Sequence, residues 1–207
     1  MQQQSNVLAD LVTKVPEVDA QVDENGNAQE VDLHRQHFEH TLQALHFIRN
    51  YLTVVPEERI QNKLVYLPEP WEPETQKKVL IFDMDETLIH CVDDIETQNP
   101  DVLLEIDFPG EETVCAGINL RPYLMQCLQE ANKMFQVIVF TASHQTYADA
   151  ILDYVDPERE LFQYRMYRQH CVQTPEGYYV KDLRIIANRR MEDMVIVDNS
   201  VYSFAYQ

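Results

Sequence analysis

The chain has 207 residues, a formal net charge of -19 at pH 7 and 45% hydrophobic residues. This length allows one domain with its own core and a short extension. The charge argues against a nucleic-acid binder and against binding to anionic membranes, because both require clustered lysine and arginine. We therefore expect protein or small-molecule partners, with no nucleic acid and no membrane.

The cysteines indicate a reducing environment. Their positions show no CxxC spacing, and a chain with a core of this size does not need disulfides; they are Cys91, Cys115, Cys127 and Cys171. The sequence shows no signal-peptide pattern and no apolar run as long as a membrane span. We expect an intracellular protein of the nucleus or cytoplasm.

The first 64 residues divide into two parts. Residues 1–30 are acidic and have no aromatic residue, which predicts a disordered tail. Residues 31–64 form a predicted helical extension, because apolar residues recur at helical spacing between Asp32, a candidate N-cap, and Pro56. The apolar stripe of helix 32–53 either packs on the following domain or binds a protein partner.

A proline-rich segment separates this extension from the main domain. Residues 65–76 contain Pro68, Pro70 and Pro73, which favour an extended linker over a helix. We place the main domain at residues 77–207.

The main domain alternates apolar strands with helices. Its predicted strands are 78–82, 102–108, 113–120, 135–140, 164–168 and 194–198, and its predicted helices are 121–133 and 144–155. Segments 102–108 and 113–120 predict an antiparallel hairpin, and a second hairpin is expected around 174–177. Strands that are apolar on both faces and separated by helices predict an α/β fold with a parallel sheet covered on both sides.

Polar residues follow these strands, where ligands of such sheets bind. They are Asp83 and Asp85, Thr141 and Ser143, Asp198 and Asn199, with Lys181 in the intervening segment. Residues two apart in an extended chain point the same way, so Asp83 and Asp85 can enter one pocket while Met84 points away. We expect Glu86 to be a turn residue outside that pocket.

Two carboxylates in one pocket need a counter-charge. Asp83 with Asn199 or Asp198, a backbone carbonyl and waters would make an oxygen site suited to Mg²⁺. Thr141, Lys181 and backbone N–H groups would then bind a phosphate beside it. One carboxylate, held by the metal, would attack phosphorus, and the other would transfer the proton.

The ordered motifs "FDMDETLIH", "VIVFTAS", "YYVKDL" and "VIVDNS" resemble those of the haloacid dehalogenase superfamily. More narrowly, they resemble the FCP/SCP-like phosphatases that act on the C-terminal domain of RNA polymerase II. The resemblance covers about residues 65–207. It implies a Rossmannoid parallel sheet with helices on both faces, a small antiparallel hairpin insertion and no large cap.

The resemblance also implies an Mg²⁺-dependent reaction. Asp83 would be the nucleophile that forms an aspartyl phosphate, and Asp85 would be the general acid and base. Asp83, the backbone carbonyl of Asp85 and Asn199 would hold Mg²⁺.

The remaining motif residues would support this reaction. By the resemblance, Thr141, Ala142 and Lys181 would bind the phosphate. Asp198 would orient Lys181 or a metal-bound water. Thr87 is expected to fix the loop after the first strand by hydrogen bonding.

The spacing of the motifs leaves no room for a cap domain that would enclose a small metabolite. An open pocket admits a phosphorylated side chain on a protein segment, so we expect phosphoserine or phosphothreonine in a phosphoprotein. The segment 91–120 would line the approach. Arg165 or Arg168 would either reach the residues beside the phosphate or form a charged surface.

The last residues depart from the family pattern. The family domain continues with a further strand and helix, whereas this chain stops at "YSFAYQ". We therefore expect a fragment, a shortened isoform or a chain completed by a partner at its C-terminus, with an exposed sheet edge. Two other functions stay open, a non-catalytic binding or scaffold component and a capless phosphatase of small molecules.

Overall fold

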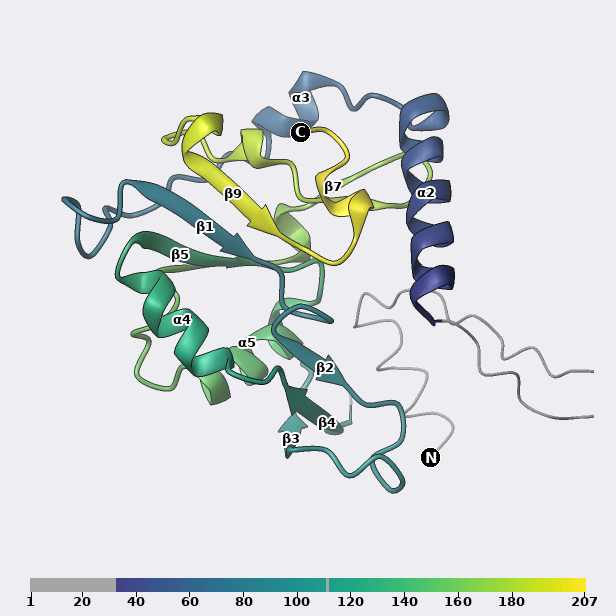
Figure 1. Cartoon of the computed structure of the whole chain (residues 1–207), viewed down its shortest axis with the longest axis vertical. Helices are drawn as coiled ribbons and strands as arrows, with labels where there is room; N and C mark the ends of the chain where they lie inside the picture. Colours follow the sequence, from purple (N-terminus) through teal and green to yellow (C-terminus); the bar gives the residue numbers. More distant parts are fainter. Residues whose placement is uncertain (1–32, 111) are drawn as a thin grey trace, which may run out of the picture.

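A parallel β-sheet forms the centre of the protein, which we describe from a computed structural model covering residues 33–110 and 112–207. Its strands are β1 (Lys78–Phe82), β5 (Phe135–Phe140), β6 (Tyr164–Met166) and β9 (Met194–Val197), in the order β6-β5-β1-β9 (Figure 1). The predicted α/β fold with a parallel sheet is thus confirmed. The acidic tail predicted for residues 1–30 lies outside the described residues.

Two helices cover one face of this sheet. They are α4 (Leu124–Asn132) and α5 (Gln145–Val155), which bury apolar residues such as Leu128 and Ile151. Val137 and Val139 of β5 belong to the same buried cluster. The alternation of side chains along a strand sends their neighbours Ile138 and Phe140 to the opposite face.

The opposite face is covered partly by residues that precede the sheet. Val55, Ile60, Val65 and Leu67 are buried in one cluster with Ile138 and Phe140, and Ile60 lies in α3 (Glu57–Gln61). The backbone of this segment also joins the domain, because the N–H of Val65 donates to the carbonyl of Ile185 at 2.8 Å. The division into an extension at 31–64 and a linker at 65–76 stays a prediction.

A small antiparallel sheet is inserted between β1 and β5. Strands β2 (Ile89–Cys91), β3 (Val102–Ile106) and β4 (Val114–Leu120) lie in the order β2-β4-β3. The predicted hairpin is confirmed as β3 and β4, whereas β2 is an additional strand. The described residues between β1 and β5 form only this sheet, α4 and their connections, so there is no large cap domain there.

Helix α2 (Leu33–Tyr51) contacts the domain through its C-terminal half. Its Phe47 ring lies 5.6 Å from the ring of Tyr178 and 6.2 Å from that of Tyr202, and these two tyrosines stack at 4.2 Å. Phe38 and Leu42, nearer the start of the helix, are 60% and 49% exposed. The apolar stripe therefore packs on the domain at one end and is uncovered at the other.

The last third of the chain consists mainly of short elements. They are η1 (Arg168–His170), β7 (Val172–Gln173), β8 (Tyr179–Val180), η2 (Leu183–Ile185), η3 (Met191–Asp193) and η4 (Val201–Phe204). The predicted hairpin near 174–177 is confirmed, and its turn uses Gly177 at a φ of +96°. The predicted strand at 164–168 is shorter than expected, because the chain turns into η1 at Arg168.

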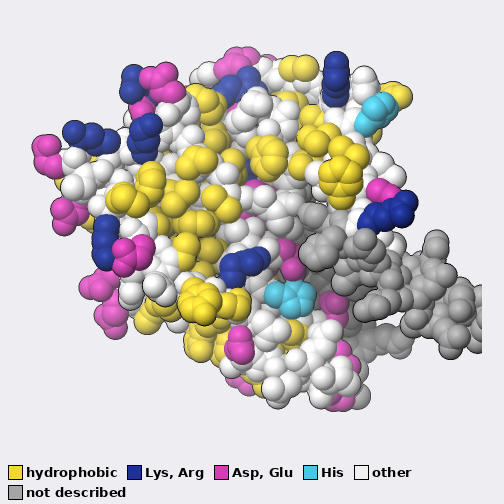
Figure 2. All heavy atoms as spheres, viewed as in Figure 1, with side chains coloured by type: hydrophobic (Ala, Val, Ile, Leu, Met, Phe, Trp, Pro, Cys, Tyr) yellow, Lys and Arg dark blue, Asp and Glu magenta, His cyan; other side chains and the backbone are white. Residues whose placement is uncertain are grey.

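Strand β9 forms an edge of the main sheet. Its Val195 and Val197 are 50% and 42% exposed, and hydrophobic side chains gather on the face of the molecule seen in Figure 2. Val195 and Val197 pair with Leu80 and Phe82 of β1 in the parallel register.

Within residues 33–110 and 112–207, no helix combines the length and apolar character that a membrane span requires.

Candidate active site

A lysine joins two aspartates at the carboxyl ends of the central strands. Asp83 follows β1, Asp198 follows β9 and Lys181 follows β8. The Lys181 ammonium donates to Asp83 Oδ1 and, at 2.5 Å, to Asp198 Oδ2. All three side chains are almost fully buried. The structure thus brings together three of the predicted site residues.

Burial controls the ionisation of this group. It raises the pKa of Asp83 to about 7, although Lys181 opposes the rise, while Asp198 and Asp85 add to it. Burial also disfavours the charged form of Lys181, but Asp83 and Asp198 outweigh it and raise the pKa of that ammonium. Lys181 is therefore the positive member of the group, and its charge does not fully compensate the carboxylates.

Asp85 has a different set of partners, all of them hydroxyl groups. Its Oδ2 accepts from Ser143 Oγ at 2.7 Å and from Thr141 Oγ1 at 3.4 Å, and its Oδ1 accepts from Tyr147 Oη at 3.0 Å. Burial raises the pKa of Asp85, and the hydrogen bonds from Ser143 and Tyr147 partly oppose that rise. Burial therefore dominates the proton affinity of this carboxyl, and the hydroxyl donors and the charge of Lys181 act against it.

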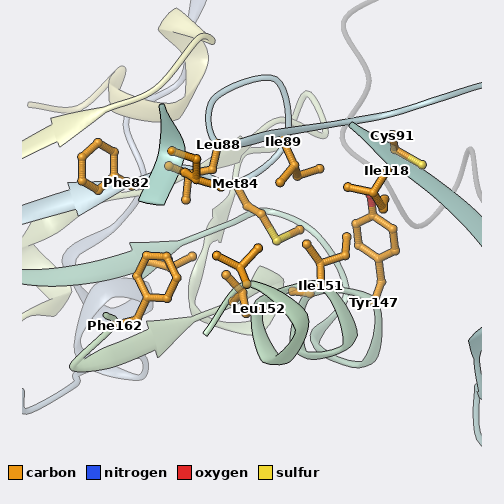
Figure 3. Close-up of a cluster of buried hydrophobic side chains, with 14 of the residues drawn as sticks. Phe82, Met84, Leu88, Ile89, Cys91, Ile118, Tyr147, Ile151, Leu152 and Phe162 are labelled. Atoms are coloured by element: carbon orange, nitrogen blue, oxygen red, sulfur yellow. The ribbon is translucent and has the colours of Figure 1, made fainter. Parts of the chain in front are cut away.

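The loop between the two aspartates and β2 is fixed from several sides. Met84 is fully buried and extends into the apolar cluster beside Ile151 and Leu152 (Figure 3). Thr87 Oγ1 donates to Asp83 Oδ2 at 3.3 Å. Glu86 has a left-handed φ of 59°, and its Oε1 atom lies 2.6 Å from Nδ1 of His90. Met84 points away from the aspartates as expected, and Glu86 occupies a turn.

Arg121 adds a second clamp to this loop. Its guanidinium donates to the carbonyl of Thr87 and, at 3.0 Å, to the carbonyl of Glu86. Its backbone N–H donates to the carbonyl of Leu88 at 3.0 Å. Arg121 therefore ties the start of α4 to the loop that carries Asp83 and Asp85.

The remaining predicted residues are Ala142, Asn199 and the two candidate arginines, Arg165 and Arg168. The Ala142 carbonyl accepts from Arg168 Nε at 2.6 Å. Asn199 directly follows Asp198 and is partly buried. Arg165, in contrast, is bound to Asp149 and Asp153 of α5. Of the two candidate arginines, only Arg168 thus contacts the loop after β5.

The donor chemistry at these strand ends fits Mg²⁺. Asp83, Asp85 and Asp198 provide three buried carboxyl groups against the single ammonium of Lys181, which leaves negative charge for a hard cation to offset. No group of three His, Cys, Asp or Glu residues in the described part of the chain is arranged to hold a metal. The predicted set differs from such a group, since it uses the amide of Asn199 and a backbone carbonyl.

Sequence reasoning missed two of the residues that shape this site. Tyr147 and Arg121 had no predicted role, and Ser143 was noted only for its place after a strand. Ser143 precedes His144, the N-cap of α5, and Tyr147 lies in the first turn of that helix. No local spacing links the two residues, and only the fold shows the positions of Tyr147 and Arg121.

Comparison with known sequences shows the family to which this fold belongs. The sequence profile of the NLI interacting factor-like phosphatases matches residues 78–207. The chain therefore belongs to this family, and the resemblance noted from its motifs is confirmed.

Individual relatives agree with this family. Nuclear envelope morphology protein 1 of Schizosaccharomyces pombe is 38% identical over 128 residues, which are 62% of this chain and 26% of that protein. CTD small phosphatase-like protein 3 of Caenorhabditis elegans is 37% identical over 137 residues, covering 64% of this chain and 45% of the relative. The chain thus spans about a quarter to a half of the length of these relatives.

A solved structure supports the fold. The fission yeast RNA polymerase II CTD phosphatase Fcp1, bound to beryllium fluoride, aligns with a TM-score of 0.52 and 21% sequence identity. The alignment covers 63% of this chain and 39% of the other. At this identity the likeness shows a shared fold.

Proposed function

We propose that this protein is an Mg²⁺-dependent phosphoprotein phosphatase that hydrolyses phosphoserine and phosphothreonine through an aspartyl phosphate. The observation that carries this proposal is the contrast between two neighbouring buried carboxyl groups. Asp83 is bound to the ammonium of Lys181, whereas the side-chain partners of Asp85 among the described residues are hydroxyl groups. Such a pair can divide the work of nucleophile and proton carrier.

In the first step, a carboxylate oxygen of Asp83 attacks phosphorus, and the bond from phosphorus to the serine or threonine oxygen breaks. The leaving oxygen takes the proton of Asp85, so the products are a free hydroxyl side chain and a phosphorylated Asp83. Burial raises the pKa of Asp85, which favours the protonated form that this step needs. The site therefore supports general acid catalysis by Asp85.

In the second step, water attacks the phosphorus of the aspartyl phosphate. Asp85, ionised by the first step, accepts a proton from this water, and the bond between phosphorus and Asp83 breaks. Inorganic phosphate leaves, and both carboxyl groups return to their starting states. The same residue thus serves first as acid and then as base.

Positive charge and hydrogen-bond donors would hold the phosphate. Lys181 is the buried cation beside Asp83, and the hydroxyl of Thr141 and the backbone N–H of Ala142 are the proposed further donors. Asp198 holds Lys181 in place, and Thr87 holds Asp83. These contacts orient the nucleophile before a substrate binds.

Asp83, the backbone carbonyl of Asp85 and Asn199 are the proposed holders of Mg²⁺. When bound, the metal would supply positive charge that offsets the excess of carboxylates and the charge of the phosphate. Without the metal, the pKa of Asp83 is raised to about 7, so a large part of this carboxyl would be protonated near neutral pH. A nucleophilic carboxylate must be ionised, and a bound cation would favour the ionised form. The raised pKa therefore supports a metal at this position.

A protein substrate suits this site better than a small metabolite. The described residues between β1 and β5 build only the small β2-β4-β3 sheet and α4, so no cap domain encloses the site from there. Relatives are named as CTD small phosphatases, and peptides resembling the C-terminal domain of RNA polymerase II are candidate substrates. We propose an intracellular location, in the nucleus or cytoplasm.

The test compares turnover of a phosphoserine peptide with that of sugar phosphates, each with and without Mg²⁺. We expect the peptide to have the higher kcat/KM and to require Mg²⁺. Faster turnover of the sugar phosphates would favour a small-molecule phosphatase. A well-folded protein that hydrolyses neither substrate would favour a non-catalytic binding component. Beryllofluoride bound to Asp83 in a crystal would identify the nucleophile directly.

A further inference from the structure

A cationic cavity lies beside the candidate active site. Its volume is about 320 Å³, and its lining includes Arg59, Lys63, Arg168 and Tyr179. Among the residues that the structure describes, no aspartate or glutamate lines this cavity, although the whole chain carries a formal net charge of -19. A concentration of positive charge in so acidic a protein indicates a site for an anion.

Two of these cations are held by backbone carbonyls. Arg59 Nη1 donates to the carbonyl of Gln173 at 3.3 Å, and Lys63 Nζ donates to the carbonyl of Gln169 at 2.6 Å. Neither is paired with a carboxylate among the described residues. Each of these bonds uses only one of the several N–H donors of its side chain. Arg59 and Lys63 are therefore positioned by the protein, and their charges are not neutralised.

The cavity and the candidate active site share a wall. Cys171, which lines the cavity, is buried and directs its thiol to the carbonyl of Thr141 at 3.8 Å. Arg168 lines the cavity and donates to the carbonyl of Ala142 at 2.6 Å. Burial raises the pKa of the Cys171 thiol to about 12, while Lys181 and Lys63 both act to lower it. Both ammonium groups are thus near enough to this thiol to affect its pKa.

A second cavity extends this surface away from the active site. Its volume is about 490 Å³, and it shares Asn62 and Lys63 with the first. Its described lining residues likewise include no aspartate or glutamate. The two cavities together offer a path for an extended chain that passes Lys63.

We propose that Arg59 and Lys63 form a binding site for a second phosphoryl group on a substrate segment whose first phosphoryl group lies at Asp83. This inference rests on the proposed function, and it adds a preference for closely spaced double phosphorylation. Guanidinium and ammonium groups bind phosphate through charge-assisted hydrogen bonds. Both residues precede residue 78, outside the part of the chain that matches the family profile.

The test measures binding to the full chain with Asp83→Asn, which removes the proposed nucleophile and one negative charge. A singly phosphorylated peptide is compared with doubly phosphorylated peptides whose second phosphate lies two to six residues to either side. We expect at least one doubly phosphorylated peptide to bind about tenfold more tightly, which is the range of charge-assisted contacts. The same measurement is then repeated with the Arg59→Ala/Lys63→Ala pair added.

We expect this pair to abolish the gain, and the charge-preserving Arg59→Lys/Lys63→Arg pair to retain most of it. Lys133→Ala is a matched control, because Lys133 follows α4 and is paired with the exposed Glu130; it should keep the gain. No gain at any spacing, or a gain that survives the alanine pair, would overturn the inference.

Turnover of the singly phosphorylated peptide by the unsubstituted chain tests the proposed function separately. If this turnover is absent while the gain in binding still depends on Arg59 and Lys63, the proposed catalysis is wrong and the second phosphate site stands. If turnover is normal and the gain is absent, only the second site is wrong.

Discussion

Asp83 and Asp85 are two residues apart, yet their surroundings are opposite. Asp83 faces the ammonium of Lys181, which is shared with Asp198. Asp85 faces the hydroxyls of Ser143, Thr141 and Tyr147. Both carboxyl groups lie in the loop after β1, but the segments that surround them give them different chemistry.

This contrast supports the proposed division of roles between Asp83 and Asp85. Burial raises the pKa of both carboxyl groups, but only Asp83 has a cation as its hydrogen-bond partner. A cation favours the ionised form that a nucleophile requires. Neutral donors in a buried setting leave Asp85 free to carry a proton. Substitution of Asp83 and substitution of Asp85 should therefore reduce activity in different ways.

The largest effect is expected for Asp83→Asn. An amide cannot form the acyl phosphate, so kcat should fall by about 10⁴-fold or more on every phosphate ester. Turnover of a phosphoserine peptide and of an aryl phosphate measures this loss. Asp153→Asn is a control, because Asp153 is half exposed on α5 and bound to Arg165; it should retain activity. If Asp83→Asn kept more than about a few per cent of the turnover of the unsubstituted chain on both substrates, Asp83 would be excluded as the nucleophile.

A smaller and substrate-dependent loss is expected for Asp85→Asn. A serine or threonine oxygen needs a proton as it leaves, so kcat on the peptide should fall by about 10²-fold to 10⁴-fold. A nitrophenolate leaves without a proton, so the first step with an aryl phosphate should be affected much less. The measurement is the burst of nitrophenol under single-turnover conditions. Equal losses on both substrates would contradict the acid role of Asp85.

The central fold could be predicted from the sequence because its signals are local. The apolar runs at 78–82 and 135–140 are strands β1 and β5 with the predicted bounds. Polar residues directly after such runs must lie at one edge of a parallel sheet. The proximity of Asp83 and Asp198 follows from that rule, whereas Lys181 follows β8 of the separate antiparallel pair β7-β8.

Thr141 and Ser143 follow β5 and were expected at this strand end, but the third partner of Asp85, Tyr147, could not be predicted in the same way. Its position depends on how α5 packs against the sheet, and no local pattern fixes the direction of its hydroxyl. Strand β2 has three residues, too few for a periodic signal, and it is identified by its pairing with β4. Arg121 is separated from the loop it clamps by this whole inserted sheet. Long-range packing decides each of these features.

A shift in pH dependence is expected for Tyr147→Phe. The Tyr147 hydroxyl lowers the pKa of Asp85, so its removal should raise that pKa further. Because the general acid must be protonated, the alkaline limb of kcat/KM on the peptide should move to higher pH, by about one pH unit. The profile of kcat/KM from pH 5 to pH 9 measures this effect.

Tyr167→Phe is the matched control for that profile. The Tyr167 hydroxyl donates to Asp149 at 2.6 Å, outside the candidate site, so its loss should leave the alkaline limb in place. Both variants remove one hydroxyl from a buried tyrosine. A shift of the same size in both would mean that altered packing, and not the bond to Asp85, moves the profile.

The smallest expected effect is on stability. It distinguishes the role of Asp83 from that of Asp85 without a measurement of enzymatic activity. The pKa of Asp83 is about 7 in the folded protein against an ordinary 3.8, so the folded state retains a proton that the unfolded chain releases. The stability from this proton is fully present below about pH 4 and is lost as pH rises to about 7. A divalent cation that binds ionised Asp83 should offset that loss.

Excess Mg²⁺ should therefore raise the free energy of unfolding more at pH 8 than at pH 5, by on the order of 1 kcal/mol at tenfold excess over Kd. This corresponds to a few degrees in Tm, measured with Ca²⁺-free buffers and matched ionic strength. Asp83→Asn should abolish the difference between the two pH values, because the amide does not titrate. Asp85→Asn should preserve it, since the proposed metal contact of Asp85 is its backbone carbonyl. If Asp85→Asn abolished the difference as well, the carboxylate of Asp85 would have to bind the metal, and the two aspartates would share one role.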